Sequence, residues 1–160
     1  MRRFVFQFCL YIALIVAVLP LLTKTATANP ATLTRATEYF RTGRYPEALS
    51  LFQQAEATDR VSGVIGASRT LVMTGRYAAA EAICRRILRE REGELRIISQ
   101  LAEILAMTGR SDEALNILEP AVSAVASPLS LVQYGRLLQL RGRRGEARAL
   151  FQRAVSLYDS

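Results

Sequence analysis

The tripeptide Thr-Gly-Arg occurs at residues 42–44, 74–76 and 108–110, and Arg-Gly-Arg at residues 141–143 takes the same place a fourth time. The central glycines of these tripeptides are 32, 34 and 33 residues apart. Glycine readily accepts the positive φ with which many helices end, so each tripeptide is expected to form the turn between two helices. A unit that recurs at this period indicates a chain built of stacked helix pairs.

The residues around each turn glycine repeat as well. A small residue stands seven positions before it and a tyrosine or leucine four before it, while alanine stands five positions after it and an apolar residue nine after it. In that order the residues are Ala36, Ser68, Ala102 and Gly135; Tyr39, Leu71, Leu105 and Leu138; Ala48, Ala80, Ala114 and Ala147; and Phe52, Cys84, Leu118 and Phe151. Spacings of three, four and seven place such residues on one helical face.

This pattern resembles the tetratricopeptide repeat (TPR) family, and the resemblance covers residues 29–160. It implies an all-α fold, an α-solenoid of four helix-turn-helix (TPR-like) repeats in a right-handed superhelix. The expected repeats span about 29–60, 61–93, 94–127 and 128–160. The expected helices span about 30–42, 46–58, 62–74, 77–90, 94–108, 111–125, 128–141 and 144–158. Pro120 lies inside one of these helices and should kink or shorten it, because proline removes a backbone hydrogen bond.

Residues 1–28 form a separate N-terminal segment. Arg2 and Arg3 precede an apolar run at 4–22, and small residues follow at Ala26 and Ala28. This is the pattern of a secretory signal peptide, which predicts a mature chain that begins at Asn29. A 19-residue apolar run is also close to the ~20 residues of a membrane-spanning helix, so an uncleaved N-terminal membrane anchor is the alternative. Either interpretation predicts exported repeats, periplasmic or anchored to the inner membrane and facing the periplasm.

The composition argues against catalysis. The chain has no histidine, its single lysine is Lys24, and its two cysteines are Cys9 and Cys84. The body after residue 28 therefore lacks the usual general base, a Schiff-base lysine and the ligands of a zinc site. We expect no enzyme activity, no metal and no cofactor.

The resemblance also implies where a partner binds. TPR domains bind peptides on the concave face, which is lined by the first helix of each pair, so we expect a protein–protein interaction scaffold or adaptor in the bacterial cell envelope. The family's groove positions fall on Thr37, Phe40, Arg41, Arg69, Met73, Arg96, Ser99, Glu103, Met107, Gln133, Arg136 and Gln139. The alternative is a solvated face, with Phe40, Met73 and Met107 packing between repeats. Some TPR domains clamp a terminal carboxylate, but of the matching positions only Arg96 is suitable here, so that mode is not expected.

A second class of function is RNA binding, which a related helical-repeat family performs. Binding of phosphates requires a cationic groove. Residues 29–133 contain 12 arginines and 12 acidic residues, so this part of the chain is neutral. No nucleic-acid partner is therefore expected.

Positive charge is concentrated instead at the C-terminal end. Residues 134–160 carry six arginines and two acidic residues. No capping helix follows the last expected helix, whose apolar residues exceed one inward stripe. We expect this C-terminal edge to be a docking surface for a second copy, an acidic partner or anionic lipid, unless arginine stems cover it. Its principal residues are Arg141, Arg144, Arg148 and Leu157.

Overall fold

The computed structural model describes residues 30–158, so the predicted leader and its cleavage site lie outside the described residues. Within 30–158 the chain forms eight α-helices and no strand. The helices are α2 (Pro30–Arg41), α3 (Tyr45–Ala55), α4 (Arg60–Met73), α5 (Tyr77–Glu90), α6 (Leu95–Met107), α7 (Ser111–Ala124), α8 (Pro128–Leu140) and α9 (Arg144–Ser156).

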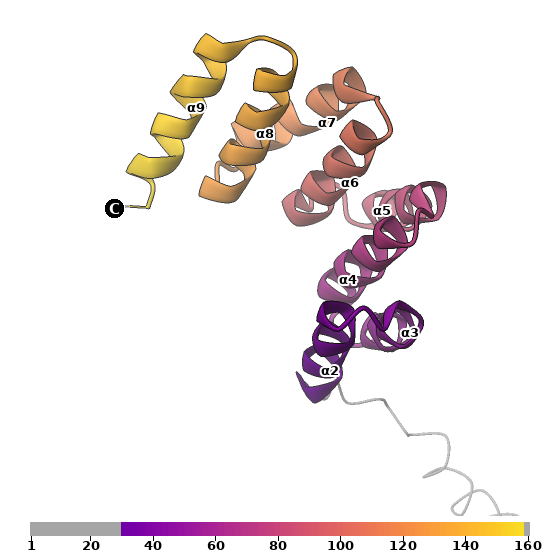
Figure 1. Ribbon diagram of the computed structural model, residues 1–160. Helices are drawn as coiled ribbons and strands as arrows, with labels where there is room; N and C mark the ends of the chain where they lie inside the picture. Colours follow the sequence, from indigo (N-terminus) through magenta and orange to yellow (C-terminus); the bar gives the residue numbers. More distant parts are fainter. Residues whose placement is uncertain (1–29, 159–160) are drawn as a thin grey trace, which may run out of the picture.

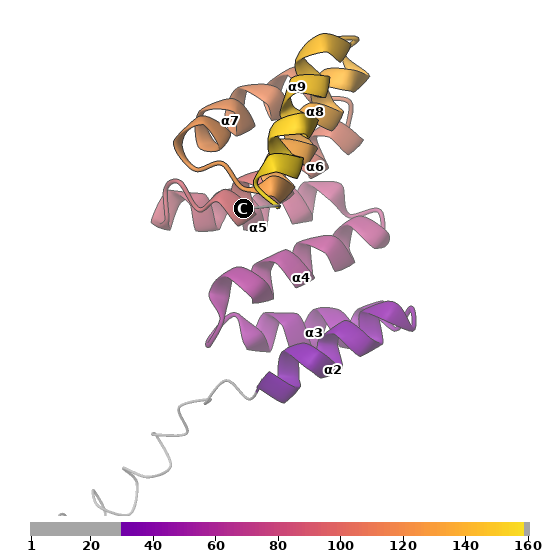
Figure 2. The ribbon, with the colours of Figure 1, turned by 90° about the vertical axis from the view of Figure 1, so that its left-hand side faces the viewer.

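The helices stack as four antiparallel pairs, α2/α3, α4/α5, α6/α7 and α8/α9, which follow one another from one end of the molecule to the other (Figure 2). Each second helix packs against the first helix of the next pair. Successive first helices also touch one another, whereas between residues 30 and 158 successive second helices make no backbone contact. The first helices therefore lie on the inner side of the arc that Figure 1 shows. The predicted all-α solenoid is confirmed.

The four turns have the same backbone geometry. Gly43, Gly75, Gly109 and Gly142 have φ values of 77°, 75°, 80° and 77°. In each turn the amide of the following arginine donates to a carbonyl five residues earlier, as from Arg44 to Tyr39 at 2.8 Å. This is the Schellman arrangement, which satisfies helix carbonyls that would otherwise have no partner. The turns predicted from the glycines are thus confirmed.

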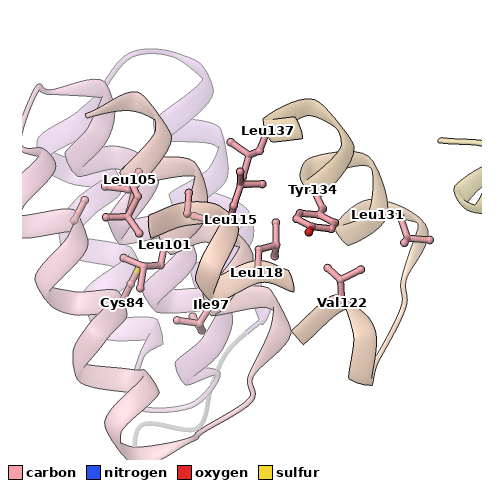
Figure 3. Close-up of a cluster of buried hydrophobic side chains, with 14 of the residues drawn as sticks. Cys84, Ile97, Leu101, Leu105, Leu115, Leu118, Val122, Leu131, Tyr134 and Leu137 are labelled. Atoms are coloured by element: carbon pink, nitrogen blue, oxygen red, sulfur yellow. The ribbon is translucent and has the colours of Figure 1, made fainter. Parts of the chain in front are cut away.

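The core lies both within the helix pairs and between successive pairs (Figure 3). The four alanines that follow the turns are at most 2% exposed, which lets the two helices of each pair approach closely. Larger buried side chains, including Ile97, Leu105, Leu118 and Leu131, fill the space beside them. Burial of such apolar side chains is the main stabilising term for this fold.

Two helices differ from the prediction. Helix α3 ends at Ala55 rather than near 58, because Asp59 caps the next helix by accepting a hydrogen bond from the Ser62 amide at 3.0 Å. Helix α7 continues past Pro120 to Ala124 and is as long as α5, so of the two predicted effects of Pro120, a kink or a shorter helix, the shortening does not occur. Pro120 and Asn116 are both exposed, and the Asn116 carbonyl that the proline leaves unpaired can bond to water.

Candidate functional site: the concave face

Residues between 30 and 158 line two hollows on the concave face. The N-terminal hollow has a volume of about 280 Å³ and lies between the first three repeats. The C-terminal hollow has a volume of about 300 Å³ and lies between the last two repeats. The N-terminal hollow is lined by Leu33, Thr37, Phe40, Phe52, Ser62, Ile65, Gly66, Arg69 and Arg96. The C-terminal hollow is lined by Ser99, Ala102, Glu103, Ala106, Met107, Leu118, Gln133, Arg136, Leu137 and Leu140.

The floor of the N-terminal hollow is apolar and aromatic. Phe52 reaches it from α3 and is buried against Gly66 of α4, where a β-carbon would overlap the phenylalanine ring. Phe40 reaches it from α2, and its ring contacts that of Tyr45 edge to face. The close approach of α3 and α4 therefore depends on a glycine in a helix interior, a position where glycine is otherwise unfavourable.

Two arginines border the same hollow. The Arg69 guanidinium of α4 lies over the Phe40 ring, 5.9 Å from its centre, in a cation–π contact. Arg96 of α6 donates a hydrogen bond to the Ser62 hydroxyl at 3.4 Å. Among residues 30–158, these two guanidinium groups are the charged side chains that line this hollow.

The C-terminal hollow has a larger apolar lining and is electrically balanced. Leu118 and Leu137 are buried at its base, while Met107 and Leu140 are exposed beside it. Glu103 of α6 and Arg136 of α8 supply one charge of each sign. The Gln133 side-chain oxygen is buried and has no hydrogen-bond partner within residues 30–158. An unpaired buried oxygen is unfavourable, so a donor from a bound partner would stabilise it.

The sequence-predicted groove residues divide into three groups. The N-terminal hollow brings together Thr37, Phe40, Arg69 and Arg96. The C-terminal hollow brings together Ser99, Glu103, Met107, Gln133 and Arg136. Arg41, Met73 and Gln139 are exposed and line neither hollow.

Some lining residues were missed by the sequence reasoning. Phe52 and Leu118 belong to second helices, which the family resemblance assigns to the convex side, so no sequence signal placed them in the floor. Leu140 could have been found, because it stands two residues before its turn glycine, as Met73 and Met107 do.

The predicted C-terminal edge is partly apolar and partly cationic. Val155 on α9 is 61% exposed, whereas Val122 at the matching position of α7 is 3% exposed. Leu157 and Tyr158 are also exposed. Arg144 and Arg148 are exposed, while Arg141 forms an ion pair with Asp112 at 2.7 Å. In the part of the chain that the structure describes, no element packs on the outer side of α9.

The one thiol between residues 30 and 158 has the properties of a core residue. Cys84 is fully buried in the central cluster, and this burial raises the pKa of its thiol to about 11. A thiol with so high a pKa is protonated at neutral pH and is a poor nucleophile. Over the described range no three His, Cys, Asp or Glu side chains are placed to hold a metal ion, and no helix is long and apolar enough to cross a bilayer.

A solenoid of helix pairs with an accessible concave face defines a helical-repeat protein of the class that binds other proteins. The Tetratricopeptide repeat family matches residues 33–94, 71–133 and 128–153, so this chain belongs to that family. TPR repeats are protein–protein interaction modules, and the chain is accordingly a protein-interaction scaffold.

One curated relative is cellulose synthase operon protein C of Pseudomonas fluorescens (strain SBW25). It is 30% identical to this chain over 128 residues, which cover 72% of this chain and 10% of that protein. The chain thus spans about a tenth of the length of this relative.

Solved structures show the same fold. A thermophilic TPR protein of Thermus thermophilus, TTC0263, has a TM-score of 0.68 at 22% identity, and the match covers 82% of this chain and 75% of that protein. MamA has a TM-score of 0.62 at 17% identity over 91% of this chain and 86% of its own. MamA from Desulfovibrio magneticus RS-1 has a TM-score of 0.59 at 18% identity, covering 80% and 74%.

Proposed function

We propose that this chain is a non-catalytic adaptor of the bacterial cell envelope that binds a protein or peptide in its concave groove. The observation that carries this proposal is the pair of hollows on the concave face, each with an apolar floor and charged residues at its border. Such a combination suits a protein ligand, because apolar side chains fill pockets while polar groups fix orientation.

Exposed apolar side chains are a second observation that supports a binding surface on this face. Met73, Met107 and Leu140 occupy the same position in three successive repeats and are 55%, 55% and 76% exposed. Large apolar residues that repeat on one face at such exposure are unfavourable in water unless a partner covers them. Methionine in particular adapts its shape to different ligand side chains.

The non-catalytic part of the proposal is supported by residue types. Histidine is absent from the whole sequence, and Cys84 is buried with a raised thiol pKa. The envelope location is supported by the leader pattern of residues 1–28, with its basic start, apolar run and small residues. The relative's name connects that protein with a cellulose synthase operon, and proteins encoded beside this chain are the first partners to test.

The groove is tested by crosslinking the chain to its partners in envelope fractions of the native host and identifying the proteins that it captures. The Met107→Glu/Leu140→Glu double variant should lose the proteins that the parent chain captures, because two carboxylates would face the apolar floor of the C-terminal hollow. The control is Ala82→Glu/Val125→Glu, which adds the same charge at exposed positions that line neither hollow. Identical captured proteins for parent and double variant would contradict the proposal, and nuclease-sensitive material would favour RNA binding.

The location is tested by N-terminal sequencing of the protein from its host. We expect a start at Asn29 in the exported soluble fraction. A start at Met1 in the membrane fraction would support the anchor, and recovery from the cytoplasm would contradict export.

A further inference from the structure

We propose that Met107 is a site of reversible oxidation, at which conversion of the thioether to a sulfoxide by a peroxide weakens partner binding in the C-terminal hollow. This inference rests on the proposed groove function and specifies how binding at that site is regulated.

The exposure of the methionines is the first observation. The sequence contains three methionines, of which Met73 and Met107 lie within residues 30–158. They are the last residues of α4 and α6, and each is 55% exposed. Methionine is otherwise among the residue types that are most often buried. A peroxide dissolved in water therefore reaches both side chains without any opening of the fold.

The cysteine sulfur of the described residues is protected by comparison. Cys84 is 0% exposed, and this burial raises the pKa of its thiol to about 11. Cysteine is oxidised as the thiolate, so a buried and protonated thiol reacts slowly. A methionine thioether does not ionise, and its reaction needs only access to the oxidant. The fold thus directs a peroxide to the two methionines.

The reaction requires no catalytic group from the protein. A lone pair of the methionine sulfur attacks one oxygen of hydrogen peroxide, so that a sulfur–oxygen bond forms and the oxygen–oxygen bond breaks. The departing hydroxide takes the proton of the transferred hydroxyl group, which leaves methionine sulfoxide and water. The sulfur loses two electrons and the peroxide gains them. The sulfoxide is polar where the thioether was apolar, and sulfoxide reductases reverse the change.

The position of Met107 gives its oxidation a consequence for binding. Met107 lines the C-terminal hollow, with Leu118 and Leu137 buried at the base and Leu140 exposed beside it. An apolar group of the partner that fills this hollow covers the end of the Met107 side chain. A sulfoxide oxygen there would be enclosed by apolar surfaces, and burial of a polar group in such surroundings is unfavourable.

Met73 provides a matched comparison within the same chain. Met73 and Met107 both stand two residues before a turn glycine and are equally exposed, but Met73 lines neither of the two hollows. Its oxidation should leave binding in the C-terminal hollow unchanged. The fourth repeat carries Leu140 at this position, so leucine is a suitable replacement that cannot be oxidised.

Peptide mapping by mass spectrometry tests the modification itself. The purified full chain is treated with hydrogen peroxide, and the excess is destroyed with catalase. We expect the peptides that contain Met73 and Met107 to gain one oxygen atom each, while Cys84 stays a thiol until the chain is unfolded in urea. A Met107 that is oxidised only in urea would overturn the inference.

Capture of the native partner tests the consequence. Because catalase removes the peroxide first, the envelope fraction is not itself oxidised. The oxidised parent chain should bind its partner about tenfold more weakly than the untreated chain. Oxidised Met73→Leu should show the same loss, whereas oxidised Met107→Leu should bind as the untreated parent does. Sulfoxide reductases that act on both sulfoxide epimers should restore binding by the oxidised parent.

Equal binding by the oxidised and untreated parent chains would overturn this inference, as would a loss that persists in oxidised Met107→Leu. In both cases the untreated parent would still capture its partner and Met107→Glu/Leu140→Glu would still abolish that capture, so the groove function would stand. An untreated parent chain that captures no protein would instead contradict the groove function, and the inference with it.

Discussion

At the scale of single residues, glycine has two distinct uses in this chain. The turn glycines supply positive φ, and no neighbouring atom lies within 4 Å of where their β-carbon would stand. Gly63, Gly66 and Gly135 instead lie inside helices, where a β-carbon would collide with the adjacent helix. At Gly63 the collision involves backbone atoms, 2.7 Å from the Glu56 nitrogen and 2.8 Å from the Phe52 carbonyl oxygen. Backbone atoms cannot move aside as a side chain can.

Gly63→Ala should therefore destabilise the fold. The added methyl group must push α4 away from the end of α3, and overpacking of this kind typically costs about 1–3 kcal/mol. The control is Gly145→Ala in the first turn of α9, where the site is exposed and open, so the higher helix propensity of alanine should stabilise by up to about 1 kcal/mol. Urea unfolding measures both changes. A Gly63→Ala variant as stable as Gly145→Ala would contradict the close approach.

At the scale of helices, the inner and outer sides of the solenoid are joined differently. First helices touch directly, whereas α5 and α7 are linked by ion pairs. Glu81 of α5 accepts hydrogen bonds from Arg85 and from Arg110 at the start of α7, each ion pair measuring 2.8 Å. Glu113 of α7 accepts from the same two arginines at 2.6 Å. Side chains thus connect the second and third repeats where their backbones do not meet.

The stability of this connection should depend on pH. Burial alone would raise the pKa of Glu81, but hydrogen bonds from Arg85 and Arg110 lower it below its ordinary value. Arg85 and then Arg110 lower the pKa of Glu113 in the same way. Carboxyls with a lowered folded-state pKa stabilise the fold above about pH 4.3, the ordinary glutamate value, and this contribution is lost as pH falls further.

Urea unfolding between pH 7 and pH 3 measures the effect. The Glu81→Gln/Glu113→Gln variant should show a smaller loss of unfolding free energy on acidification than the parent chain, because it has lost two of the carboxyls that titrate. The exposed pairing at Arg41 and Glu38 provides the control variant Glu38→Gln, which removes one i,i+3 pair and should follow the parent curve closely. Parallel curves for the parent and the double variant would show that the network does not stabilise the fold.

At the scale of the whole molecule, the two ends of the stack differ. In α2, Arg35 and Glu38 are exposed. At the equivalent positions, the first helices of the later repeats carry residues that are buried against the preceding helix pair. These later residues are Ala67, Leu101 and Tyr134 at the first position and Thr70, Ile104 and Leu137 at the second. Within residues 30–158, the outer face of α2 is therefore polar at these two positions, while the C-terminal edge exposes apolar side chains on α9.

This difference predicts how copies of the chain associate. We propose contact between two C-terminal edges, because α9 and its C-cap expose Val155 and Leu157. Light scattering should show a dimer at high concentration and a monomer for Val155→Glu and Leu157→Glu. Added salt should strengthen the dimer, since Arg144 and Arg148 of the two copies repel each other at low ionic strength. A parent chain that remains monomeric at every concentration would contradict this proposal.

Local sequence was sufficient to predict most of the fold and part of the site. Each turn is encoded within a few residues, because positive φ and the small residues seven before and five after the glycine are local requirements. Helix positions and the burial of Ala114 or Leu118 follow from this register. The same register places nine of the twelve predicted groove residues in one or other hollow, since first helices share an orientation.

Only the tertiary structure decided which groups from different repeats meet. Phe52 enters the N-terminal hollow because α3 approaches α4 at Gly63 and Gly66, a contact that depends on the angle between helices. Arg69 and Arg96 border one opening because α4 and α6 are adjacent, although 27 residues separate them in the chain. Periodicity assigns each residue to a face of its own helix. The distance between faces of different helices is set by how side chains pack, which the periodic pattern alone does not contain.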